Sequence, residues 1–114
     1  MPFLGLLDTD KIEITAPGYV RLDLSAFDFR MSPPRTDRHH FCMINANTIK
    51  WHAKAKWRRV CYVAVYSDVM DGEPLQVVMM NQSHQVYCND ILQMVPGQLT
   101  LDSKFMELIK VESS

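Results

Sequence analysis

The chain has 114 residues, the size of one ordinary domain, so we expect a single hydrophobic core and no hinge between lobes. Hydrophobic residues make up 47% of the chain and charged residues 22%, which is typical of a globular protein and excludes a disordered tail. The net charge of −1, from 12 basic and 13 acidic residues, gives no long-range attraction to nucleic acid or to an anionic membrane. Any basic surface must therefore act locally.

The first ten residues, MPFLGLLDTD, do not match a secretory signal, because the apolar run is short and no basic region precedes it. No stretch of the chain approaches the ~18 apolar residues of a membrane span. We therefore expect a protein that is made and folded in a cytoplasm. Its three cysteines are odd in number and lie in apolar surroundings, which predicts reduced, buried thiols at Cys42, Cys61 and Cys88.

Alternation of apolar and polar residues predicts half-buried strands in the first part of the chain. In 11–15, KIEIT, Ile12 and Ile14 would share the buried face. The segment 19–27, YVRLDLSAF, would bury one alternating set and expose the other: Val20, Leu22 and Leu24 opposite Tyr19, Arg21 and Asp23.

Three later segments also predict strands. Residues 98–102, QLTLD, alternate and would bury Leu99 and Leu101. The runs 60–66, VCYVAVY, and 74–80, PLQVVMM, are apolar on both faces, which is typical of central strands covered by a second sheet or a neighbouring subunit. We expect the methionines of this region to fill gaps in the core, namely Met79, Met80 and Met94.

Turn residues separate the apolar runs at 16–18, 32–35, 71–72 and 96–97. Short strands with turns this closely spaced predict an all-β fold, an antiparallel β-sandwich of the jelly-roll or immunoglobulin-like type. No βαβ spacing occurs. We assign 1–103 to one sandwich domain and 104–114 to a C-terminal arm or final strand. The segment 30–40, RMSPPRTDRHH, is expected to be an exposed loop.

Metal and catalytic chemistry find little support in the sequence. His39, His40 and Cys42 are close in sequence, but adjacent residues of a strand point to opposite faces and cannot easily bind one ion. His52 and His84 lie far away and complete no ligand spacing. Neither a nucleophile motif nor a glycine-rich phosphate loop is present. We therefore expect no catalytic residues, no metal and no cofactor.

The segment 50–59, KWHAKAKWRR, interleaves basic residues with Trp51 and Trp57. Such a pattern suits single-stranded nucleic acid, through stacking on the indoles and contacts to phosphate. The alternative is structural: both indoles pack on the edge of the core, and the lysines and arginines extend into water. The neutral total charge favours the structural alternative.

The order of these motifs resembles a family of small tailed-bacteriophage virion proteins, often labelled tail-fibre proteins. In that family a G-Y-x-R strand precedes an N-N-x-I-x-F strand, a Trp-led apolar strand with a D-x-x-x-G-G-x-L turn, a G-D-x-L strand and a final G-x-L-x-L. The matching positions here are Gly18, Tyr19, Arg21, Asn45, Asn47, Ile49, Trp51, Trp57, the strand 60–66, Asp68, Gly72, Leu75, Asn89, Asp90, Leu92, Gly97, Leu99 and Leu101.

The resemblance implies a non-enzymatic virion structural protein of the capsid-decoration, collar or tail-fibre type. We expect its partners to be other virion proteins and further copies of itself, with no membrane, and nucleic acid is disfavoured as a partner. An apolar tail at 105–111 predicts that 104–114 takes part in assembly. A different class of function stays open, namely a small binding module for a cell-surface glycan or single-stranded nucleic acid.

Overall fold

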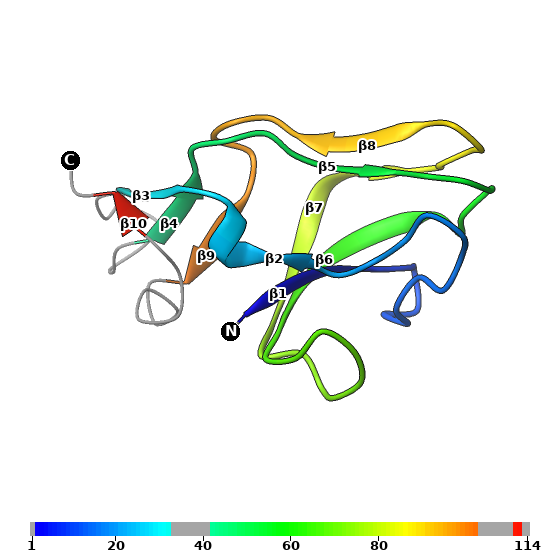
Figure 1. Cartoon of the computed structure of the whole chain (residues 1–114), viewed down its shortest axis with the longest axis horizontal. Helices are drawn as coiled ribbons and strands as arrows, with labels where there is room; N and C mark the ends of the chain where they lie inside the picture. Colours follow the sequence, from blue (N-terminus) through cyan, green and yellow to red (C-terminus); the bar gives the residue numbers. More distant parts are fainter. Residues whose placement is uncertain (1, 33–41, 103–110, 113–114) are drawn as a thin grey trace.

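The chain folds as an antiparallel β-sandwich, with one helical turn among the residues that the structure describes (Figure 1). The computed structural model describes residues 2–32, 42–102 and 111–112. The elements in chain order are β1 (Phe3–Leu7), β2 (Leu22–Asp23), the 3-10 turn η1 (Leu24–Ala26), β3 (Phe29–Ser32), β4 (Cys42–Asn45), β5 (Ile49–His52), β6 (Val60–Tyr66), β7 (Gln76–His84), β8 (Ile91–Met94), β9 (Thr100–Asp102) and β10 (Val111–Glu112).

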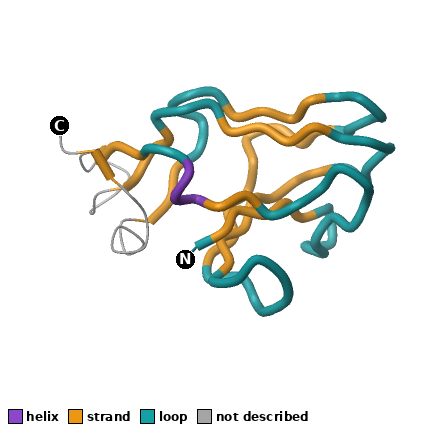
Figure 2. The backbone as a smooth tube through the Cα atoms, viewed as in Figure 1, coloured by secondary structure: helices purple, strands orange, loops and turns teal. Residues whose placement is uncertain are grey.

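The strands form three sheets with the orders β2-β1-β6-β7, β10-β3-β4-β9 and β5-β8. All paired strands are antiparallel except β10, which runs parallel to β3. Figure 2 shows the β5–β8 pair lying over the sheet that contains β1 and β6. One hydrophobic core joins these layers and includes Leu4, Val63, Trp51 and Leu92. The predicted fold class is therefore confirmed.

Period-two alternation correctly predicted a strand at β9, and the apolar run 60–66 correctly predicted β6, a strand buried on both faces. Leu99 is buried just before β9 and Leu101 within it, and β6 buries Val63 and Val65 on one face and Ala64 on the other. β6 is a central strand, since it pairs with β1 on one side and β7 on the other. The turn at Pro96 and Gly97 is also as predicted.

A buried asparagine joins β4 to the β8–β9 turn. The Asn45 side-chain amide donates to the carbonyl oxygens of Asn47 at 2.8 Å and Val95 at 3.0 Å, and its Oδ1 accepts the Leu99 amide at 2.9 Å. Its backbone carbonyl accepts the Gly97 amide at 3.0 Å. A buried amide is costly unless its hydrogen bonds are made, and Asn45 is 2% exposed with these bonds made.

Several expected strands differ from the structure. Residues 11–15 form no strand, apart from one isolated bridge between Leu7 and Glu13, and Ile12 is exposed. Residues 19–27 contain only the two-residue β2 followed by η1. The segment 30–32 belongs to β3 and was wrongly placed in a loop, whereas 33–40 lies outside the described residues. Of 104–114, the structure describes only β10.

β7 also differs from the prediction, which made it a central strand. Among the described strands it ends its sheet and is not central, and Met79 is 70% exposed where we expected it to fill the core. Met80 packs against the core as a half-buried residue, and Met94 is buried as expected. The apolar composition of β7 therefore has a cause other than burial in this chain.

Candidate interaction surfaces

A polar cluster around Arg21 lies beside the start of the β6–β7 connection. The Arg21 guanidinium donates two hydrogen bonds to the Glu13 carboxylate, from Nε at 2.7 Å and from Nη2 at 2.8 Å. Its Nη1 donates to the carbonyl oxygens of Asp68 at 2.9 Å and Asp71 at 2.7 Å. The Tyr66 ring lies 3.5 Å from the guanidinium carbon, which adds a cation–π contact.

Tyr19 completes this cluster from the other side of Glu13. Its hydroxyl donates to the Glu13 carboxylate and accepts the Leu6 amide at 3.1 Å. Gly5 leaves the space that the cluster occupies, because a Cβ atom there would lie 2.7 Å from the Tyr19 hydroxyl and 2.8 Å from the Tyr66 ring. The G-Y-x-R motif therefore has a structural role in this chain.

The charges within the cluster compensate one another. Burial raises the pKa of the Glu13 carboxyl, but hydrogen bonds from Arg21 and Tyr19 and the charge of Arg21 outweigh it and hold the pKa below the ordinary value. Burial and the hydrogen bond to Glu13 raise the pKa of Tyr19. Burial and the negative charge of Glu13 raise the pKa of Tyr66. At neutral pH the cluster thus contains one ion pair and two neutral phenols, an arrangement that holds backbone in place.

The backbone that Arg21 holds is the connection from β6 to β7, residues 67–75, which we call the acidic loop. It contains the exposed acidic side chains Asp68, Asp71 and Glu73. Two residues between them, Val69 and Met70, are exposed as well. Asp71 and Gly72 have positive φ angles of 62° and 79°, so the predicted Asp-Gly turn is present. The loop projects from the lower edge of the molecule in Figure 1.

Exposed hydrophobic side chains continue from the acidic loop into β7. Among the described residues, five of the ten exposed large hydrophobic side chains lie in the single segment 69–79, namely Val69, Met70, Leu75, Val77 and Met79. A surface groove of about 290 Å³ borders β7 and is lined on its other side by β8 and the β8–β9 turn. A long apolar strand at the edge of a sheet is a site for pairing with another chain.

The basic segment 50–59 divides into buried indoles and exposed cations. Trp51 is 2% exposed and Trp57 is 1% exposed, and each indole nitrogen donates to a backbone carbonyl, that of Val20 at 2.8 Å and that of Pro17 at 3.1 Å. The structural interpretation of both tryptophans is therefore confirmed. With both rings in the core, neither is available to stack on a base or a sugar.

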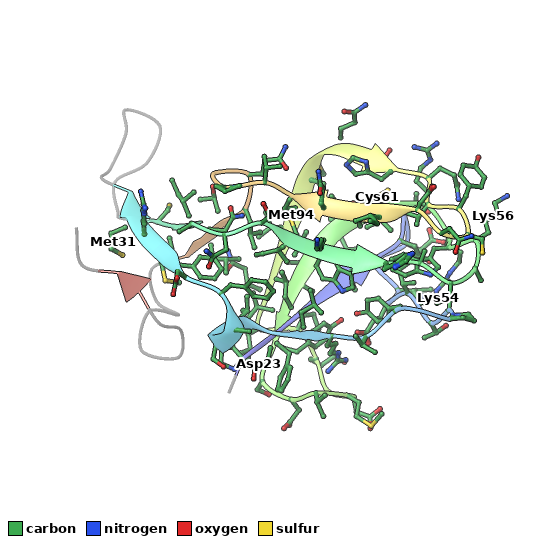
Figure 3. All side chains as sticks on the ribbon, turned by 45° about the horizontal axis from the view of Figure 1, so that its top comes forward. Asp23, Met31, Lys54, Lys56, Cys61 and Met94 are labelled. Carbon is green, nitrogen blue, oxygen red and sulfur yellow. The ribbon has the colours of Figure 1, made fainter. Side chains whose placement is uncertain are left out.

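The exposed part of this segment joins the β7–β8 connection in what we call the basic patch: His52, Lys54, Lys56, Tyr87 and Ile91. His52 and Ile91 are cross-strand partners on the outer face of β5 and β8. The Lys56 ammonium lies 5.6 Å from the centre of the Tyr87 ring. Figure 3 shows Lys54 and Lys56 together at one end of the molecule.

Other candidate residues do not come together. Cys42 is buried as expected, but Cys61 is half-buried and Cys88 is exposed, so the prediction of three buried thiols is wrong for the last two. His39 and His40 lie outside the described residues. Within 2–32, 42–102 and 111–112, no three His, Cys, Asp or Glu residues are placed to bind a metal ion. Those same residues include no helix long and apolar enough to cross a membrane.

The sequence prediction missed the Arg21 cluster and placed Arg21 in solvent. In the structure Arg21 is 8% exposed and Val20 is 62% exposed, the reverse of the alternation. The only signal in the sequence is that Tyr19 and Arg21 share the G-Y-x-R motif on which the resemblance is based. Comparison of the chain with protein-family models, with curated proteins and with solved structures gives no match.

Proposed function

We propose that this chain is a non-enzymatic structural component of a tailed-bacteriophage virion, of the capsid-decoration, collar or tail-fibre type. The observation that carries the proposal is the exposed apolar segment 69–79, whose last four residues belong to the edge strand β7. A protein that works alone in solution gains nothing from such an edge, whereas a subunit of a larger particle buries it against a neighbour. The type of particle, a tailed bacteriophage, is proposed from the order of the five sequence motifs, which resembles that of a family of phage virion proteins.

The burial of Trp51 and Trp57 weighs against the alternative class, a small binding module for glycans or single strands. That alternative required aromatic rings open to a ligand. The proposed location is the virion, after synthesis and assembly in the host cytoplasm, and the proposed partners are other virion proteins and further copies of this chain.

Mass spectrometry of gradient-purified particles tests the proposal. Particles produced from the genome that encodes this chain should contain it at a fixed ratio to the major capsid protein. If the protein stays in the particle-free fraction of the lysate, the proposal is wrong.

A pair of matched variants tests the role of the edge strand. Met79→Lys places a charge on the exposed face of β7, and Ile12→Lys places the same charge on an exposed residue outside the segment. Both proteins should keep the parent melting temperature, because both side chains extend into solvent. Only Met79→Lys should be lost from purified particles. Equal incorporation of the two variants would show that the edge strand is not part of the interface.

A further inference from the structure

Three carboxylates of the acidic loop are exposed and form no salt bridge with any residue in the described part of the chain: Asp68, Asp71 and Glu73. Arg21 is close to the loop, but it binds the carbonyl oxygens of the loop and pairs its charge with Glu13. The loop therefore presents three uncompensated negative charges around the exposed side chains of Val69 and Met70.

The basic patch is the complement of this loop in both charge and polarity. Lys54 and Lys56 likewise form no salt bridge within the described residues. Tyr87 and Ile91, each 53% exposed, provide apolar area between the cations. The carboxylate of Asp90, in the same turn, accepts the Tyr87 backbone amide at 2.9 Å, and this hydrogen bond satisfies one of its oxygens locally.

The two surfaces cannot meet within one copy of the chain. The acidic loop projects from the lower edge of the molecule in Figure 1, whereas the β5–β6 and β7–β8 connections that form the basic patch lie at its right end. A net charge of −1 thus conceals a separation of charge across the molecule. Opposite charges at separate sites favour association between copies over contact within one.

We infer that the acidic loop of one copy binds the basic patch of a second copy. Carboxylates of the loop pair with Lys54 and Lys56, and the apolar side chains of Val69 and Met70 pack on Tyr87 and Ile91. Because the contact joins two different surfaces, it leaves a free loop and a free patch on a pair and can continue into a ring or an open chain. The inference specifies the contact between copies in the proposed virion component, and it rests on that proposal for its biological setting.

The Arg21 cluster favours this contact by holding the loop before it binds. Two loop carbonyl oxygens are bonded to a guanidinium that is itself fixed by Glu13 and by the Tyr66 ring. A loop that is already ordered loses less conformational entropy on association than a free one. The interaction energy of the exposed side chains is therefore available for binding the second copy.

Sedimentation of the purified full-length chain tests the inference with charge-reversed variants. The parent should associate reversibly at low salt, at concentrations of about 10 to 500 μM, as small polar interfaces do, and association should weaken as salt rises from about 0.05 to 0.5 M. Asp68→Lys/Glu73→Lys reverses the loop, and Lys54→Glu/Lys56→Glu reverses the patch. Each variant alone should associate at least about tenfold more weakly than the parent.

An equimolar mixture of the two variants distinguishes a specific contact from a general charge effect. In the mixture, the reversed loop of one variant faces the reversed patch of the other, so association should return to near the parent level. The matched control compares Glu73→Lys with Asp10→Lys, since both residues are exposed and each substitution changes the net charge by two. Asp10→Lys should associate like the parent.

A parent that stays monomeric at low salt overturns the inference, as does a mixture that fails to associate. A monomeric parent that binds a single-stranded oligonucleotide through Lys54 and Lys56 would assign the patch to nucleic acid. The measurement uses no particles, so its failure leaves the virion proposal standing. Conversely, absence of the protein from virions leaves a measured self-association unexplained but intact.

Discussion

Replacement of Arg21 by Met is the most direct test of how the acidic loop is held. The substitution keeps an unbranched stem and removes the four hydrogen bonds that the guanidinium makes to Glu13, Asp68 and Asp71. The two carbonyl oxygens belong to an exposed loop and can turn to water. Glu13 cannot do so fully, because its side chain is only 25% exposed.

The expected loss of stability follows from the contacts that Arg21 makes and from the exposure of Glu13. Removal of one partner from a fully buried ion pair costs about 3–5 kcal/mol. Glu13 keeps the hydrogen bond from Tyr19 and some contact with water, so we expect the lower end of the range, about 3 kcal/mol. Urea unfolding followed by fluorescence of the two buried tryptophans would show this as a midpoint lower by about 2 M, for a typical slope.

The variation of stability with pH gives an independent check. The pKa of Glu13 is lowered in the folded protein, so its carboxylate contributes stability at pH values above ~4.3, the ordinary glutamate pKa, and the contribution is lost as the pH falls toward the folded pKa. Without Arg21 only the hydrogen bond from Tyr19 is left to lower the Glu13 pKa against the effect of burial, so most of this acid sensitivity should disappear.

The double variant Arg21→Met/Glu13→Leu removes both charges and should recover most of the loss. Two results would refute the view that the ion pair holds this region. One is a loss of unfolding free energy below about 1 kcal/mol for Arg21→Met. The other is a decrease in stability at low pH that is the same in Arg21→Met as in the parent.

Three further substitutions test the core and its turns by urea or thermal unfolding. Trp57→Ala should cost about 3–5 kcal/mol, and Trp57→Phe much less, because the indole is buried and not a ligand platform. Asn45→Leu should cost about 2–4 kcal/mol, since it leaves the Leu99 amide and two or more carbonyl oxygens without partners. Gly97→Ala, at φ 91° in open space, should cost about 1 kcal/mol. Gly18→Ala should cost distinctly more, because its Cβ would also lie 2.6 Å from the backbone oxygen of His52 and 2.6 Å from the backbone nitrogen of Lys54.

Much of the fold could be predicted because the local pattern of apolar residues shows how each strand is buried. Leu99 and Leu101 follow the two-residue period of a pleated strand, and the structure buries both. The run 60–66 is apolar on both faces, and the structure buries Ala64 as well as its neighbours Val63 and Val65. Turn positions could be predicted equally well, because Gly97 has a positive φ and follows a proline.

The two-residue period gave wrong predictions where long-range polar contacts determine which way a side chain points. The alternation placed Val20 inside and Arg21 outside, but the hydrogen-bond partners of Arg21 include carbonyl oxygens 47 and 50 residues away. No local pattern contains that information. The prediction that β7 is a central strand was wrong for a different reason. An apolar run has the same composition whether its own domain covers it or a partner protein does.

The Arg21 cluster and the acidic loop predict a coupling between stability and association that runs in one direction. Arg21→Met should weaken both, because the loop loses its two bonds to the guanidinium and must be ordered when a second copy binds. Glu73→Lys should weaken association alone, since its side chain is exposed and the Arg21 contacts use backbone atoms of other residues. Sedimentation and urea unfolding of the same two proteins measure both quantities. If Arg21→Met lowers stability and leaves association unchanged, the cluster supports the fold and has no part in presenting the loop.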